Sequence, residues 1–137
     1  MKKYIGPDVG DVRIGVSKSV TTGILATPLE VIKRTEKDPI KRIREILDIE
    51  KTNKLVIGIP KSLDGTKKRQ VEKIEEFILE LKEKIGSLEI FTIDERYTTV
   101  EAERYLKNYS KRSPKERRQV VDMVAATIIL QKFLDSK

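Results

Sequence analysis

The chain has neither cysteine nor histidine among its 137 residues. Without cysteine it can form no disulfides or thiolate metal sites, which favours an intracellular, cytoplasmic protein. Without histidine, Ser–His and Cys–His nucleophilic catalysis and imidazole metal sites are excluded. Any catalysis must therefore use carboxylates, lysine, hydroxyl groups or a metal ion held by oxygen ligands.

Long hydrophobic runs are also missing. Runs such as MVAATIIL are far too short to span a bilayer, and the N-terminal MKKYIG lacks the apolar stretch of a signal peptide. We therefore expect no membrane partner. Repeats, low-complexity segments and linkers rich in Pro, Gly or Ser are absent as well, so the length predicts a single domain over residues 1–137.

Positive charge is in excess. Lysine and arginine number 29 against 22 aspartates and glutamates, which gives a formal net charge of +7. So basic a small domain favours an anionic partner, with nucleic acid the first candidate. A high content of both signs is also typical of a heat-tolerant surface. Composition alone leaves both interpretations open.

The N-terminal part of the sequence predicts three strands. KYIGPDV and VRIGVSKSV indicate a hairpin with Val9, Gly10 and Asp11 at its turn. ILATPLEVI is a third extended segment, which we expect Pro28 to interrupt. A helix capped by Asp38 follows, with Pro39 in its first position and a buried stripe of Ile40, Ile43 and Leu47.

The remaining segments alternate between strand and helix. KLVIGIP is apolar throughout, as a strand covered on both faces would be, and LEIFTIDE predicts a further strand. The helix between them carries Val71, Ile74, Phe77, Ile78, Leu81 and Ile85 and stops at Gly86. Capping boxes at Thr98 and Ser113 predict a short helix and a last helix that runs to about Leu134. This order predicts an α/β fold: a mixed five-stranded sheet whose first three strands are antiparallel, then β-α-β crossovers, with helices on both faces.

Two acidic residues stand at the ends of predicted strands. Asp8 ends the first strand, where it could bind a cation or simply serve a turn. Glu95 ends the last strand, at the edge where open α/β sheets place their ligands. Asp94 and Glu95 are adjacent and point to opposite faces, so only one of them can enter a given site. The alternative for either is a solvated strand end, paired with Arg96.

Asp122 is the strongest candidate because it lies inside the apolar helix VVDMVAATIIL. Helical spacing puts it on one stripe with Ala126, Ile129 and Phe133. A carboxylate on such a stripe is costly unless a cation or several donors meet it. The alternative is a salt bridge with an arginine of KERR, one turn earlier.

Oxygen ligands without histidine suit hard divalent cations, Mg²⁺ or Mn²⁺. With a basic surface, the chemistry that follows is metal-assisted hydrolysis of phosphodiester bonds. Basic residues gather at one helix start and just before Asp122, and the second cluster would place phosphate contacts beside the acidic centre. A solvated helix face is the alternative for both clusters. The clusters are Lys67, Lys68 and Arg69, and Lys111, Arg112, Lys115, Arg117 and Arg118.

Four segments in order, DVGDVRIGVS, VIGIPKSLDG, TIDERYTTVEAERYL and VVDMVAATIILQKFLD, resemble the YqgF family, also called RuvX. These are RNase H-like proteins related to Holliday-junction resolvases of the RuvC type. The resemblance implies a nuclease that processes the 5′ end of precursor 16S ribosomal RNA, or alternatively a Holliday-junction resolvase. It implies an acidic centre of Asp8, Glu95 and Asp122 with Mg²⁺ or Mn²⁺, and phosphate contacts from Arg13 and Arg96.

The chain departs from the family pattern at two places. Pro7 stands before the first aspartate, where the family usually has an apolar residue, and a proline fits poorly in a central strand. After RIGV the family commonly has Ala-Val-Ser-Asp, whereas this chain has Ser17-Lys18-Ser19-Val20. The acid expected there is absent and takes no part in the predicted site.

Two other functional classes compete with the nuclease. DVGDVRIG also resembles the phosphate-binding hairpin of actin-like and sugar-kinase-like ATPases, which need two such lobes. An inactive nuclease fold that binds nucleic acid or ribosomal particles, as a ribosome-assembly or transcription factor, is the second. Oligomeric state stays open, since a resolvase needs two active sites in a homodimer and an RNA processor can act as a monomer.

Overall fold

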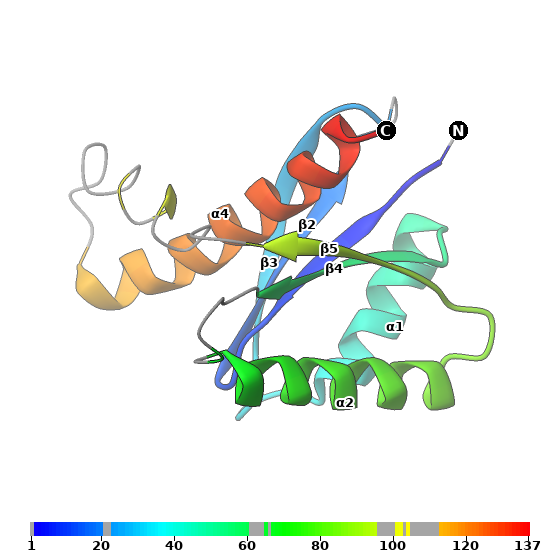
Figure 1. Ribbon diagram of the computed structural model, residues 1–137, viewed down its shortest axis with the longest axis horizontal. Helices are drawn as coiled ribbons and strands as arrows, with labels where there is room; N and C mark the ends of the chain where they lie inside the picture. The colour runs from blue at the N-terminus through cyan, green and yellow to red at the C-terminus, as the bar shows by residue number, and fades with distance from the viewer. Residues whose placement is uncertain are drawn as a thin grey trace.

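The computed structural model describes residues 2–20, 23–60, 65, 67–95, 101–102, 104 and 113–137. Within these residues, five strands form one mixed sheet in the order β3-β2-β1-β4-β5 (Figure 1). In chain order the elements are β1 (Ile5–Val9), β2 (Arg13–Ser19), β3 (Ala26–Lys33), α1 (Pro39–Glu50), β4 (Lys54–Pro60), α2 (Lys68–Lys84), β5 (Glu89–Glu95) and α4 (Pro114–Asp135).

The topology predicted from the sequence is confirmed. β1, β2 and β3 are antiparallel neighbours, whereas β4 is parallel to both β1 and β5. α1 connects β3 to β4 and α2 connects β4 to β5. The short helix predicted from Thr98 begins outside the described residues, but Glu101 and Ala102 are helical. No helix in the described ranges is long and apolar enough to cross a membrane.

The prediction that Pro28 interrupts the third strand is wrong. β3 continues through Pro28 because the register against β2 shifts at this point. Val16 lies opposite Glu30 and the next residue, Ser17, lies opposite Pro28, so one residue of β3 is bulged out. β3 is an edge strand, and edges and bulges are the places where a sheet accepts proline.

Pro7 lies inside the central strand β1, contrary to the expectation that it fits poorly there. Ser19 N–H donates to the Tyr4 carbonyl at 2.9 Å, which marks these two as a hydrogen-bonded pair of the β1–β2 ladder. Along an antiparallel ladder, hydrogen-bonded pairs alternate with pairs that are not hydrogen-bonded. Pro7 and Val16 form a pair that is not hydrogen-bonded. The missing N–H therefore costs the β1–β2 ladder nothing, and Asp8 stays within the strand.

α1 and α2 cover one face of the sheet (Figure 1). Asp38 caps α1 as predicted, its carboxylate accepting a hydrogen bond from Ile40 N–H at 3.1 Å. Inward residues of β1, β2, β3 and β4 pack against both helices and form the larger core. Its fully buried members include Ile5, Ile14, Val16, Leu55 and Ile57 from the sheet and Ile43 and Leu81 from the helices.

Among the labelled helices, α4 covers the opposite face (Figure 1). It packs closely on small residues of the strands. The buried Ser17 hydroxyl donates to the carbonyl of Ala126 at 2.9 Å. A side chain on Gly6 would meet Leu130 at 3.1 Å. Glycine and serine therefore let the helix backbone approach the strands. Ser17 thus serves this packing.

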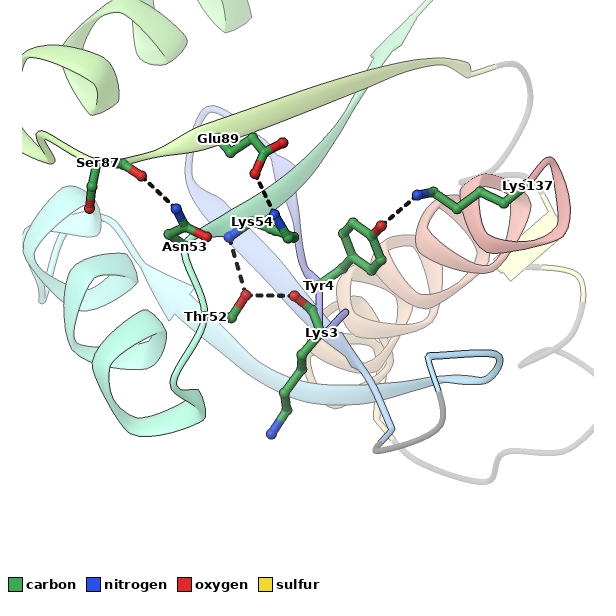
Figure 2. Close-up of polar contacts among 8 residues, drawn as sticks. All are labelled: Lys3, Tyr4, Thr52, Asn53, Lys54, Ser87, Glu89 and Lys137. Atoms are coloured by element: carbon green, nitrogen blue, oxygen red, sulfur yellow. Dashed lines mark hydrogen bonds and ion pairs between the residues drawn. The ribbon is translucent and has the colours of Figure 1, made fainter. Parts of the chain in front are cut away.

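Polar contacts tie the strands together at the edge where β1, β4 and β5 begin (Figure 2). The Thr52 hydroxyl donates to the Lys3 carbonyl at 2.6 Å, and the Asn53 amide donates to the Ser87 carbonyl at 2.7 Å. Lys137 of the C-terminus reaches the Tyr4 hydroxyl. With their starts joined, the three parallel strands bring their carboxyl ends to one opposite edge.

Candidate active site

Asp8 lies on the α4 face of the sheet, near the carboxyl end of β1. It stands directly opposite Gly15 of β2, and residues opposite each other in an antiparallel pair point to the same face. Gly15 faces α4, because a Cβ placed on it would lie 2.0 Å from the carbonyl oxygen of Asp122. The carboxyl of Asp8 is therefore directed toward the helix that carries Asp122.

Asp122 is placed over β2 by the same glycine. A contact of 2.0 Å is far below van der Waals separation, so no other residue than glycine fits at position 15 without displacing α4. Ala126, Ile129 and Phe133 continue the stripe of Asp122 and are buried, as the helical spacing predicts. Asp122 itself is half-buried at the end of this stripe.

Glu95, rather than Asp94, faces α4. A Cβ on Gly58 of β4 would lie 3.0 Å from Ile129 of α4 and 3.3 Å from the Cβ of Glu95. Glu95 is therefore on the helix-covered side with Gly58, and its neighbour Asp94 takes the opposite side. Gly58 leaves space for the Glu95 side chain between β5 and β1.

The electrostatics of Asp8 show that the three acids lie near one another. Burial, followed by the negative charges of Glu95 and Asp122, raises the pKa of Asp8 to about 7. Like charges shift a pKa only at short range, so the carboxylates of Glu95 and Asp122 lie close enough to Asp8 for their charges to act on it. Burial also raises the pKa of Asp122, and the Arg13 guanidinium opposes this shift.

Arg13 forms an ion pair with Asp122. Its Nε–H donates to Oδ2 at 2.5 Å, and the two side chains are 30% and 23% exposed. The alternative considered from the sequence, a partner from the KERR segment of the same helix, is wrong. The partner comes from the start of β2, on the same face as Gly15. Arg13, expected to contact phosphate, thus also contacts the acidic centre.

The donor set suits a hard divalent cation, since it consists of carboxylate oxygens on one face. A cation would also relieve the repulsion that raises the Asp8 pKa. No three acidic side chains in the described part of the chain are already gathered closely enough to hold one ion. The carboxylates suit the metal chemically and lie on the same face of the sheet. Their side chains must still move closer together to hold one ion.

Three of the six basic residues predicted to contact nucleic acid belong to the start of α4. Arg118 is exposed one turn before Asp122, and Arg117 is half-buried beside it. Lys115 belongs to α4, but its side chain is outside the described residues, as are Arg96 and Arg112 altogether. Two of the predicted cations are therefore placed on the helix that carries Asp122.

A groove of about 260 Å³ lies beside the β1–β2 turn, on the α2 face. This turn belongs to the segment that resembles a phosphate-binding hairpin. Arg34 in its wall already donates to the Gly10 carbonyl at 2.7 Å, and Lys73 pairs with Asp11 at 3.3 Å. Glu76 and Glu80 add negative charge. Acids and engaged cations of this kind disfavour a triphosphate.

Sequence reasoning missed Gly15 and Gly58 as residues that shape the site. A glycine inside a strand indicates a close backbone approach, and this signal was present in VRIGVS and KLVIGIP. The pairing of Arg13 with Asp122 carried no local signal, because 109 residues separate them.

Comparisons with known proteins agree along the whole chain. A protein-family profile described as "RuvX: Holliday junction resolvase" matches residues 2–136. A protein of Fusobacterium nucleatum named "Putative pre-16S rRNA nuclease" is 54% identical over 137 residues, covering 100% of this chain and 99% of that protein. A protein of Thermoanaerobacter pseudethanolicus with the same name is 40% identical, covering 98% and 97%.

Solved structures give the same fold at low identity. RuvC of T. thermophilus in complex with a Holliday junction substrate has a TM-score of 0.55 at 14% identity, covering 99% of this chain and 95% of that chain. The Fowlpox virus resolvase in complex with Holliday junction DNA has a TM-score of 0.51 at 8% identity, covering 98% and 97%. The sheet and its helices therefore have the RNase H-like resolvase fold.

Proposed function

This chain belongs to the RuvX family, and on that basis we propose that it is a metal-dependent nuclease that hydrolyses phosphodiester bonds of structured nucleic acid. The proposal is supported by Asp8, Glu95 and Asp122 lying on the α4 face, with the charges of Glu95 and Asp122 contributing to the raised pKa of Asp8. We take residues 1–137 to form one domain around this site.

Asp8, Glu95 and Asp122 would hold Mg²⁺ or Mn²⁺ through carboxylate oxygens. Such an ion, when bound, supplies activation of water and stabilisation of the leaving oxyanion. The chain itself supplies the setting. Burial and repulsion at Asp8 make the deprotonated cluster costly, so the site gains most from a cation at pH values above about 7.

Cations near the acids would position the backbone of the substrate. Arg118 projects from α4 one turn before Asp122, and Arg117 lies beside it. Arginine contacts phosphate with two parallel donors, independently of base sequence. The site would therefore recognise nucleic acid by backbone position and shape, which is consistent with the net charge of +7.

The substrate we propose is the 5′ end of precursor 16S rRNA, free or within ribosomal particles in the cytoplasm. The names of the two bacterial relatives support it, because both cover nearly the whole of this chain. A four-way DNA junction is the second candidate, favoured by the description of the family profile. A resolvase would act as a homodimer, whereas RNA processing can proceed in a monomer.

Cleavage assays with both substrates test the proposal. Precursor 16S rRNA and a four-way DNA junction are each incubated with the protein in Mg²⁺, Mn²⁺ or a chelator. We expect metal-dependent cleavage of the RNA, reduced at least about 100-fold in Asp122→Asn, which keeps the size of the side chain but removes its charge. Asp135→Asn changes an exposed aspartate at the end of the same helix and should cleave normally.

The outcomes separate the candidates. Preferential cleavage of the junction would replace the RNA with branched DNA as substrate. Tight binding to either substrate with no cleavage in any metal would identify a binding module. Cleavage that persists in chelator, or in Asp122→Asn, would refute the metal-dependent site.

A further inference from the structure

We propose that Arg13 is a positioning residue that competes with the divalent ion for Asp122. In the metal-free protein its guanidinium neutralises Asp122 and keeps the acidic centre open. When a cation binds the carboxylates, Arg13 is released toward the phosphate of the substrate. This inference rests on the proposed nuclease function and deepens it by coupling metal binding to substrate binding.

The first supporting observation is the geometry of the pair. Arg13 opens β2 two residues before Gly15, so it points to the α4 face as Gly15 does. Its Nε–H donates to Oδ2 of Asp122 at 2.5 Å. Oδ2 is therefore engaged by a cation of the chain itself, at the carboxylate that a metal would need.

The second observation is the arrangement of the remaining charges. The negative charges of both Glu95 and Asp122 act on Asp8, whereas the cation Arg13 is paired with Asp122. No three of the acids within the described ranges are yet gathered closely enough for one ion. The pair holds the carboxylate of Asp122 toward Arg13 of β2, which is consistent with this separation.

The third observation is the donor capacity of Arg13. A guanidinium has five N–H donors, and the hydrogen bond of Arg13 to Asp122 uses Nε alone among the described residues. The side chain is 30% exposed, so its outer donors can reach a ligand at the surface. Once Asp122 turns to a metal, the donors of Arg13 are available to a substrate phosphate.

Metal binding to Arg13→Gln tests the competition. Melting temperature is followed by circular dichroism while MgCl₂ or MnCl₂ is added to the metal-free protein, and a dissociation constant is fitted. Arg13→Gln should melt lower in chelator and bind the metal at least about five-fold more tightly than the parent, the lower range of coupling between linked sites.

Arg42→Gln is the matched control. Arg42 lies away from the acidic centre and forms an ion pair with Glu30 at 2.6 Å. The side chains of Arg42 and Glu30 are 26% and 22% exposed, close to the exposure of Arg13 and Asp122. This variant loses a comparable ion pair and should bind metal as the parent does. Unchanged or weaker metal binding in Arg13→Gln would overturn the proposal, because Arg13 would then only support Asp122.

The parent protein offers an independent measurement should Arg13→Gln fold poorly. The Nε–H proton of Arg13 is hydrogen-bonded to Asp122, so its NMR signal should be protected from exchange with water and lose that protection when Mg²⁺ is added. The Nε–H of Arg42, bonded to Glu30 at 2.9 Å, should keep its protection. Retained protection at Arg13 in saturating Mg²⁺ would overturn the release.

Failure of the proposed function looks different from failure of this inference. A parent protein whose melting responds to neither metal, and which cleaves neither RNA nor the junction, would refute the nuclease itself. A parent that binds metal and cleaves, while Arg13→Gln gains no affinity, would refute only the competition.

Discussion

Replacing Asp8 with asparagine should make the metal-free protein more stable at alkaline pH. Burial, with the charges of Glu95 and Asp122, raises the pKa of Asp8 from 3.8 to about 7. Between these values the native protein keeps a proton that the unfolded chain releases, so stability falls as the pH rises through this window. Above pH 7, the difference between the two pKa values corresponds to roughly 4 kcal/mol of lost stability. The side chain of Asp8 is only partly shielded from water, so we expect about 2–4 kcal/mol.

Asparagine stays neutral at every pH and removes this cost. Asp8→Asn should therefore exceed the parent by about 2–4 kcal/mol at pH 8 in chelator, and by less than about 1 kcal/mol at pH 4. Urea unfolding followed by circular dichroism at several pH values measures the difference, since the chain has no tryptophan to report by fluorescence. Asp11→Asn is the control, because Asp11 is 72% exposed in the neighbouring turn and its replacement should change little at any pH.

Parallel pH profiles for Asp8→Asn and the parent would refute the reasoning. Such a result would mean that the carboxyl is not buried beside other negative charges, and the acidic centre would not exist as described. Addition of Mg²⁺ gives a second check. Ligand binding to the native state should raise the stability of the parent and so reduce the difference in unfolding free energy between Asp8→Asn and the parent.

Two further predictions concern the helix that carries Asp122. Gly15→Ala should lower the free energy of unfolding by about 1–3 kcal/mol and abolish the melting response to Mg²⁺, because its Cβ would overlap the Asp122 backbone. Gly86→Ala, which has nothing within 4 Å, is the control and should change neither property. An unshifted melting temperature in Gly15→Ala would contradict the close approach of α4 to β2. Neutralising Arg117 and Arg118 should weaken nucleic-acid binding across sequences and flatten the dependence of affinity on salt, whereas Arg44→Gln on α1 should do neither. An unchanged salt dependence would mean that Arg117 and Arg118 form only a solvated helix face.

The sequence by itself determined the helices and strands and indicated the acids that we propose as the site. Strand alternation, helical spacing and the caps at Asp38 and Ser113 are local properties of the backbone, so they were readable and the structure confirms them. The lack of histidine and cysteine limited the catalytic groups to carboxylates, lysine, hydroxyl groups or a metal ion held by oxygen ligands. A carboxylate on the apolar stripe of α4 identified Asp122 before any fold was known.

Only the tertiary structure decided how these residues meet. The bulge that carries β3 through Pro28 depends on pairing with β2, and the choice of Glu95 over Asp94 depends on which face α4 covers. Arg13 and Asp122 are 109 residues apart, so their ion pair follows from strand order and from the closeness of α4 to Gly15. Local pattern fixes the direction of a side chain from its own backbone, whereas its partners and its pKa depend on register and packing between distant segments.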